Sequence, residues 1–167
     1  MYSVGNLVMY GIHGACRSTD LEERSVDHKR VSYFVLEPLE GSGAKFLIPT
    51  HNETALAKLR PILSREELDT LLHSAEVHQG VWIQDENQRK QRYRELINSG
   101  DRMTLLQMVS TLHAHRERQA AAGRKFHLCD DNFLRDAQRL LSAEFSLVLG
   151  LDTVQTEKYV LEALNKE

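Results

Sequence analysis

The feature that most constrains the fold is a change in hydrophobic period near residue 52. Residues 2–49 form short apolar runs, rich in β-branched and aromatic residues, that end at Gly or Pro, as strands of an antiparallel sheet do. Beyond residue 52 the apolar residues recur at helical spacing, and Gly100, Gly123 and Gly150 follow three of these patterns, as glycines at helix C-termini commonly do. A β-rich half followed by a helical half predicts the α+β class.

Five runs in the first half are predicted to be strands. They lie at residues 7–10, 15–19, 24–26, 31–36 and 45–48. Glycines and the polar turn Asp27-His28-Lys29 separate them. Several short strands with tight turns in about 50 residues indicate a small, strongly curved antiparallel sheet or an SH3-like barrel. Such a sheet leaves an edge on which a strand of another protein can pair, unless the sheet closes fully.

The second half is predicted to contain about five helices. They span roughly residues 64–72, 85–99, 102–122, 130–150 and 152–165. Ser64 and Glu67 have the spacing of a capping box at the first of them, and Asp130 or Asp131 is expected to cap the fourth. The apolar side chains expected to be buried on the fourth helix are Phe133, Ala137, Leu140, Leu141, Leu147 and Val148. We therefore expect two domains, 1–55 and 56–167.

The charge of the chain is spread unevenly. Residues 86–125 contain nine basic and four acidic residues, a net charge of +5, so the rest of the chain carries −8 of the overall −3. A local positive field attracts a phosphate backbone even when the whole protein is acidic. The same charges are also typical of the solvated faces of surface helices, and the charge count alone does not separate these two interpretations.

Motifs that carry chemistry are missing from the sequence. There is no Gly-rich phosphate loop, dinucleotide-binding pattern or H-E-x-x-H motif, so nucleotide-dependent and zincin-type enzymes lack their usual signatures. His13 with Cys16, and His127 with Cys129, are spaced like pairs of metal ligands, but a zinc site needs four. We expect no catalytic residue, metal or cofactor.

The targeting and redox signals indicate the cytoplasm. The N-terminus has no basic start followed by an apolar core, and the longest apolar run is only a few residues, whereas a membrane helix needs about 20. Cys16 and Cys129 are far apart in the sequence. In a chain without an export signal they are expected to be reduced thiols in a cytoplasmic protein.

Trp82 is the only tryptophan, and it precedes the basic run of the helix predicted at residues 85–99. It lies outside the apolar stripe of that helix, which consists of Tyr93, Leu96 and Ile97. One interpretation is structural: the indole packs over the helical core as a staple or lid. The other is functional: the indole is an apolar wedge for the minor groove of DNA, while neighbouring cations bind phosphates.

The order of motifs resembles the CarD/CdnL family of bacterial transcription regulators. "YSVGNLVMYGIHG" resembles the start of that family, "YFVLEPL" and "KFLIP" its next two strands, and "NSGD" and "AEFSLVLG" its helical half. The collinear set covers nearly the whole chain. At the start, the matching residues are Val4, Gly5, Val8, Tyr10, His13 and Gly14.

This resemblance implies a non-enzymatic regulator of RNA polymerase. Its Tudor-like N-terminal domain would bind the lobe of the polymerase β subunit, mainly by strand-edge pairing. Its helical domain would approach promoter DNA at the upstream edge of the bubble, where a tryptophan stabilises the open complex. Carried onto this sequence, the wedge is Trp82 and the phosphate contacts are Arg89, Lys90 and Arg92. We expect a monomer.

The match to the family has two departures. Family members place the tryptophan within two residues of an Arg-Arg pair, but here Trp82 is seven residues before Arg89, which adds about a turn or more of helix or loop. In the β half, Arg24 falls where a polymerase-contacting basic residue is usual. Leu47 stands near a second such position, and Lys45 is the candidate substitute there. The alternative for both basic residues is simple solvent exposure.

Three other interpretations stay open at this stage. The protein could be an interaction module that binds polymerase while its helical half recruits protein partners without touching DNA. It could bind RNA or DNA independently of polymerase. An enzyme is the most distant of the three.

Overall fold

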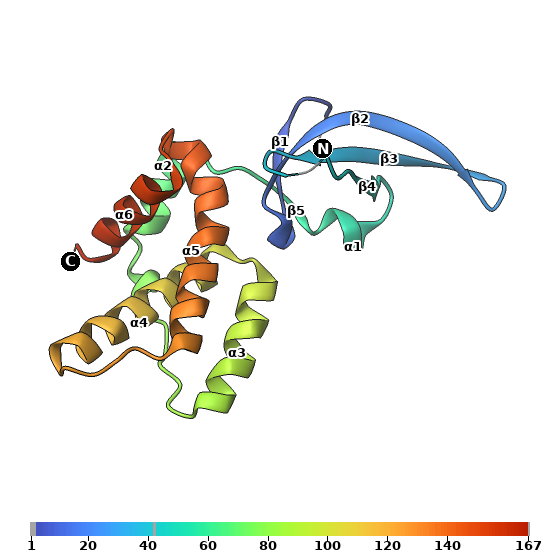
Figure 1. The fold of residues 1–167 in the computed structure, drawn as a ribbon. Coiled ribbons are helices and arrows are strands. Elements are labelled where there is room, and N and C mark those ends of the chain that lie inside the picture. The colour runs from blue at the N-terminus through green and yellow to red at the C-terminus, as the bar shows by residue number, and fades with distance from the viewer. Residues whose placement is uncertain (1–2, 42, 167) are drawn as a thin grey trace. The chain divides into compact units, whose positions relative to one another are not determined.

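The computed structural model describes residues 3–41 and 43–166, which divide into two compact units at the junction of Ile62 and Leu63. The first unit is β-rich and the second is helical (Figure 1). The α+β class predicted from the sequence is confirmed.

The first unit is built on a five-stranded antiparallel sheet in the order β4-β3-β2-β1-β5. A single 3₁₀ turn follows β1, and one short helix precedes β5. The elements are β1 (Leu7–Tyr10), η1 (Gly11–His13), β2 (Ala15–Val26), β3 (Lys29–Pro38), β4 (Phe46–Pro49), α1 (Glu53–Leu56) and β5 (Leu59–Pro61). The core of this unit consists of Val8, Cys16, Leu36, Ile48 and Leu59.

Strand β2 corrects the prediction of two separate strands at residues 15–19 and 24–26. It is continuous from Ala15 to Val26, and a shift in its register with β3 between Ser18 and Asp20 absorbs the break in apolar pattern. A bulge of this kind bends a strand without ending it. The predicted turn is present, with Asp27 and His28 both at positive φ. Together β2 and β3 form a long curved ribbon (Figure 1).

Strand β5 is an element that the sequence patterns did not reveal. It has three residues and ends in Pro61, so it carries little of the strand signal. It pairs with β1 at the edge of the sheet, where a proline is tolerated because its missing N–H leaves no ladder bond unmade. This pairing joins residues 59–61 to the first unit.

The second unit contains five α-helices and one 3₁₀ turn within the described residues 63–166. They are α2 (Arg65–Leu72), η2 (Ala75–His78), α3 (Glu86–Ser99), α4 (Arg102–Ala121), α5 (Leu128–Leu149) and α6 (Thr153–Leu164). The capping box of Ser64 and Glu67 is confirmed. Gly100 and Gly150 adopt the left-handed conformation directly after α3 and α5, and Gly123 has a positive φ just past α4.

Helix α5 begins earlier than predicted. His127 is the residue at its N-cap, and Asp130 and Asp131 lie inside its first turn, so the expectation that one of them caps the helix is wrong. Asp130 is fully buried and its carboxylate is bound to a side chain of another helix. The expected burial of Leu147 is also wrong, because this side chain is 42% exposed.

The helices enclose a single apolar core. Helix α4 packs on α5 and η2, α5 packs on α6, and α3 contacts both α4 and α5. The largest fully buried side chains of this core are Phe145, Leu68, Leu72, Leu105, Leu106, Leu112 and Leu134. Within the described part of the chain, no helix has the length and apolar character needed to cross a membrane.

Candidate nucleic-acid interface

Trp82 lies in the irregular segment 79–85 that connects η2 to α3. It is half-buried and packs against the helical core. Its indole is stacked on the imidazole of His115 on α4, with ring centres 3.7 Å apart and planes 17° from parallel. The indole is therefore neither free on the surface nor enclosed in the core, and the two interpretations of Trp82 from sequence are not mutually exclusive.

Arg89, on the first turn of α3, is buried beside Trp82 with only 3% of its surface exposed. Its Nε and Nη2 donate to the two carboxylate oxygens of Asp130 on α5 at 2.8 and 3.0 Å. Its Nη1 donates to the carbonyl oxygens of Ile83 and Gln84, at 2.9 and 3.4 Å. The guanidinium carbon also lies 4.4 Å from the centre of the Trp82 ring, within the range of a cation–π contact.

These contacts leave no guanidinium nitrogen of Arg89 without a partner for the phosphate contact expected from the sequence. All three guanidinium nitrogens are engaged inside the protein, and the partner Asp130 is 0% exposed. Burial alone lowers the pKa of Arg89, but the hydrogen bonds and the charge of Asp130 raise it, and the net shift is upward. Arg89 is therefore charged and internally neutralised in this arrangement.

Lys90 and Arg92, the other two expected phosphate contacts, are on the surface of α3. Lys90 pairs with Glu86 at 3.0 Å and Arg92 with Glu95 at 3.2 Å. Exposed pairs of this kind contribute only about 0–1 kcal/mol. They can therefore exchange an acidic partner for a phosphate at little cost.

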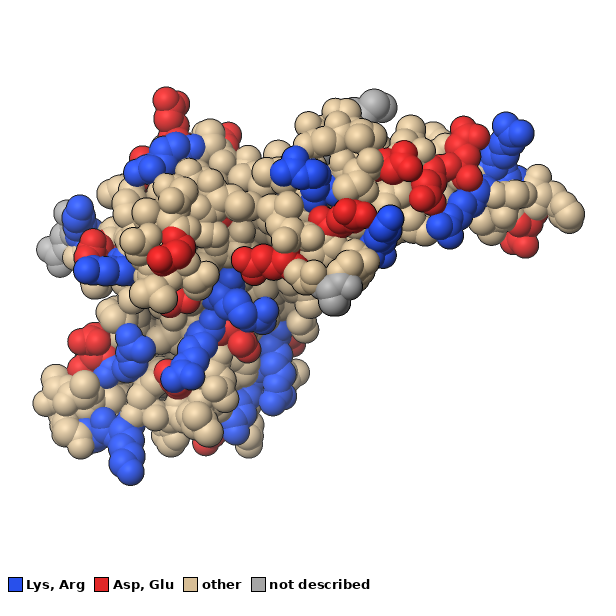
Figure 2. Space-filling model, turned by 45° about the horizontal axis from the view of Figure 1, so that its top comes forward, with Lys and Arg blue, Asp and Glu red and all other residues tan. Residues whose placement is uncertain are grey.

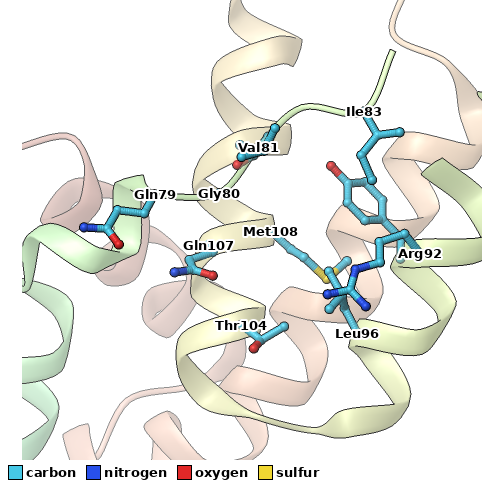
Figure 3. Close-up of a pocket in the computed structure, with 11 residues that line it drawn as sticks. Gln79, Gly80, Val81, Ile83, Arg92, Leu96, Thr104, Gln107 and Met108 are labelled. Atoms are coloured by element: carbon cyan, nitrogen blue, oxygen red, sulfur yellow. The ribbon is translucent and has the colours of Figure 1, made fainter. Parts of the chain in front are cut away.

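A pocket of about 270 Å³ lies between segment 79–83, α3 and α4 (Figure 3). Val81, Ile83 and Arg92 line it. Trp82 packs on His115 instead. Arg92 therefore lines a pocket that Trp82 does not line. The guanidinium of Arg89, by contrast, lies directly against the indole.

Gly80 lets this segment approach α4 closely. A Cβ at this position would lie 2.4 Å from Oγ1 of Thr111 and 2.8 Å from the carbonyl oxygen of Gln107. The hydroxyl can rotate away, but the carbonyl belongs to the backbone of α4. Only a glycine therefore fits here without a shift of the segment that carries Trp82.

Three further basic residues contribute to the surface near His115. Arg118, Arg124 and Lys125 are exposed and form no ion pair among the described residues. Figure 2 shows Lys and Arg side chains, interspersed with Asp and Glu, on the face of the helical unit that is in view. These residues belong to the basic segment found in the sequence, but the expected site residues came from the resemblance to the family. What the sequence did not reveal is the packing of α4 against the segment that carries Trp82.

The surroundings of His115 lower the pKa of its imidazole. Burial lowers its pKa most, and the positive charge of Arg118, one turn away, lowers it further. Asp130 acts in the opposite direction, and Arg89 and His127 add small lowering effects. A neutral imidazole can stack on the indole without the desolvation cost of a charge in a partly buried site.

In the β unit, Arg24 and Lys45 are exposed. Arg24 lies on β2 and pairs with Glu22 at 3.1 Å, and Lys45 precedes β4 and pairs with Glu37 at 3.4 Å. Strand β1 pairs with β2 only at Ala15–Arg17 in the ladder. The stretch from Asp20 to Val26 is thus paired with β3 on one side and has no strand on the other side among the described residues.

The histidine and cysteine pairs noted in the sequence do not form a metal site. His13 packs against the rings of Tyr10 and Phe46, and Cys16 is buried in the β core. Cys129 lies 3.7 Å from a carboxylate oxygen of Glu86. Across residues 3–41 and 43–166, no group of three or more His, Cys, Asp or Glu side chains could hold a metal ion.

The described part of the structure thus has a β unit with an unpaired stretch along β2 and a helical unit with exposed cations and a half-buried tryptophan. Residues 2–63 match the CarD-like/TRCF RID domain, and residues 68–161 match the CarD C-terminal domain. The two matches cover most of the chain, and the chain belongs to the CarD-like family. Membership associates it with transcription and with RNA polymerase, and its domains are regulatory.

We expect Gly80→Ala to destabilise the helical unit by about 1–3 kcal/mol, because the added methyl group collides with the α4 backbone. Chemical denaturation followed by Trp82 fluorescence measures the free energy of unfolding. The control is Val81→Ala, whose side chain is 77% exposed and whose effect should stay within about 0.5 kcal/mol. Equal effects of the two substitutions would contradict the close approach.

The fluorescence of the single tryptophan should report the titration of His115, because a protonated imidazole quenches a stacked indole. We expect a transition with its midpoint below the usual histidine value of about 6.5, since the pKa of His115 is lowered. The unfolded chain binds this proton more readily, so stability should fall as the pH drops below about 6.5. His115→Gln should abolish the transition; a midpoint at or above 6.5 would refute this account.

Proposed function

We propose that this protein binds the lobe of the RNA polymerase β subunit and stabilises the open promoter complex through Trp82. The observation that carries the proposal is the placement of the only tryptophan: half-buried, stacked on His115 and covered by Arg89. A wedge must keep its orientation when it meets DNA, and packing locks the rotamer of a functional side chain. The proposed setting, at the upstream edge of the transcription bubble, is what the resemblance to the CarD/CdnL family implies, and the two domain matches support membership of a CarD-like family.

The proposed phosphate contacts are cations at the surface of the helical unit. We retain Lys90 and Arg92 from the sequence analysis and add Arg118, Arg124 and Lys125, which have no acidic partner among the described residues. Arg89 is left out, because its guanidinium is bound to Asp130. Contacts of this kind are independent of sequence, and they weaken as salt rises because bound cations displace counterions from DNA.

The energetics suit a regulator that is tethered to polymerase. A few cations on phosphates give a nonspecific Kd on the order of 10⁻⁴ to 10⁻⁶ M. Binding to polymerase raises the effective concentration of the helical unit at the promoter. A wedge that contacts melted DNA better than closed duplex then shifts the equilibrium by the difference between the two affinities.

For the polymerase contact we propose the open side of β2. The stretch from Asp20 to Val26 offers backbone N–H and C=O groups to an added strand, the mode of binding called β-augmentation. Arg24 and Lys45 are the proposed charged contacts of the same unit, and their pairs with Glu22 and Glu37 are exposed. In this proposal the protein is a cytoplasmic bacterial monomer without enzymatic activity.

Trp82→Ala should shorten the lifetime of the open complex by roughly tenfold, because stacking of one aromatic ring against a base contributes about 1–3 kcal/mol. The measurement is the decay of polymerase–promoter complexes after addition of a competitor, at one salt concentration. Binding to polymerase should be unchanged. The control is Leu128→Ala, an apolar side chain that is 74% exposed. Equal lifetimes for the wild type and Trp82→Ala would exclude the wedge.

Charge reversal of Arg118, Arg124 or Lys125 to Glu should weaken binding to forked promoter DNA and reduce its dependence on salt. Each lost phosphate contact lowers the slope of log K against log salt by about 0.9. Fluorescence anisotropy with the polymerase complex measures both quantities. Arg139→Glu, the same charge change further along α5, is the matched control. Unchanged slopes would favour a helical unit that binds only proteins.

A further inference from the structure

Arg89 and Asp130 join two parts of the candidate interface that are distant in sequence. Asp130 lies in the first turn of α5, a few residues after Arg124 and Lys125. Arg89 lies in the first turn of α3, and its Nη1 binds the backbone that directly follows Trp82. One guanidinium thus contacts the indole, the backbone that carries it and the helix that follows the basic loop.

We propose that the Arg89–Asp130 pair is a latch that sets the position of Trp82 and holds it in a fixed relation to the basic loop 122–127. Arg89 is a positioning residue in this scheme and does not bind DNA. The relevance of the latch to transcription rests on the function proposed above. Its effect on the tryptophan is a property of the free protein.

The buried charges of Arg89 and Asp130 explain why apolar packing alone would not replace the pair. A buried charge is tolerated only when a partner and hydrogen bonds compensate it. Removal of the Asp130 charge leaves the guanidinium uncompensated, so Arg89 gains by turning toward water. That movement breaks its bonds to the carbonyls of Ile83 and Gln84 and withdraws it from the indole.

A lysine cannot take over the role of Arg89. The planar fork of arginine makes two parallel bonds to a carboxylate and still directs a third nitrogen elsewhere, whereas an ammonium group is a point charge. Arg89→Lys keeps the charge facing Asp130 but loses the geometry that reaches both the carboxylate and the two carbonyl oxygens. It is therefore a graded variant that tests geometry separately from charge.

The chain also contains a matched control. Arg102 on α4 binds the carboxylate of Glu144 on α5, which is 1% exposed and also accepts a hydrogen bond from the backbone N–H of Leu63. This pair also joins a guanidinium to a buried carboxylate, although Arg102 is more exposed than Arg89. The carboxylate of Glu144 binds Arg102 and the backbone of Leu63, and neither of these bonds involves Trp82. Glu144→Gln therefore disturbs a comparable ion pair at another place in the unit.

The test is acrylamide quenching of Trp82 fluorescence in the full chain, below the melting temperature of each variant as determined by circular dichroism. We expect the quenching constant to rise about twofold in Asp130→Asn, because the segment opens locally without global unfolding. Glu144→Gln should leave the constant at its wild-type value. Equal constants for wild type and Asp130→Asn, or equal rises in both variants, would overturn the latch.

Arg89→Lys keeps the test decisive if Asp130→Asn fails to fold. It should also raise the quenching constant, and a wild-type value in a folded Arg89→Lys protein would overturn the latch. Open-complex lifetimes of the same variants address the proposed function separately. Increased quenching together with an unchanged lifetime supports the latch and counts against the wedge.

Discussion

The candidate interface depends on one buried ion pair between Arg89 and Asp130. Two charges taken out of water are costly unless each is fully compensated, and here the carboxylate receives two bonds while the remaining nitrogen binds two backbone carbonyls. The pair fixes where α3 begins relative to α5. It also holds the irregular segment before α3 in place, and that segment carries the only tryptophan.

In the helical unit, the residues that orient the indole differ from the residues proposed to attract DNA. Arg89, Asp130 and His115 orient the indole and are wholly or partly buried. The cations proposed to attract DNA are exposed, either without an acidic partner among the described residues or in weak surface pairs. This division suits the proposed function, because exposed cations bind any phosphate backbone while the proposed wedge would act where base pairs are open.

Patterns that depend on near neighbours were predictable. The capping box at Ser64, the left-handed glycines after α3 and α5, and the turn at Asp27 and His28 follow from local backbone preferences, and the structure contains all of them. The predictions failed where tertiary contacts outweigh local signals. Strand β5 is only three residues long, and Asp130, expected as a cap, binds Arg89 instead.

The sequence by itself determined the α+β class, the order of a β-rich half before a helical half, and the basic segment, because periodicity, capping and composition are local properties of the chain. Only the tertiary structure decided which cations are free and which is neutralised. Arg89 and Asp130 are 41 residues apart, and no spacing rule relates them. Their pairing depends on how α3 packs against α5, and it makes Arg89 a support of the indole in place of a phosphate contact.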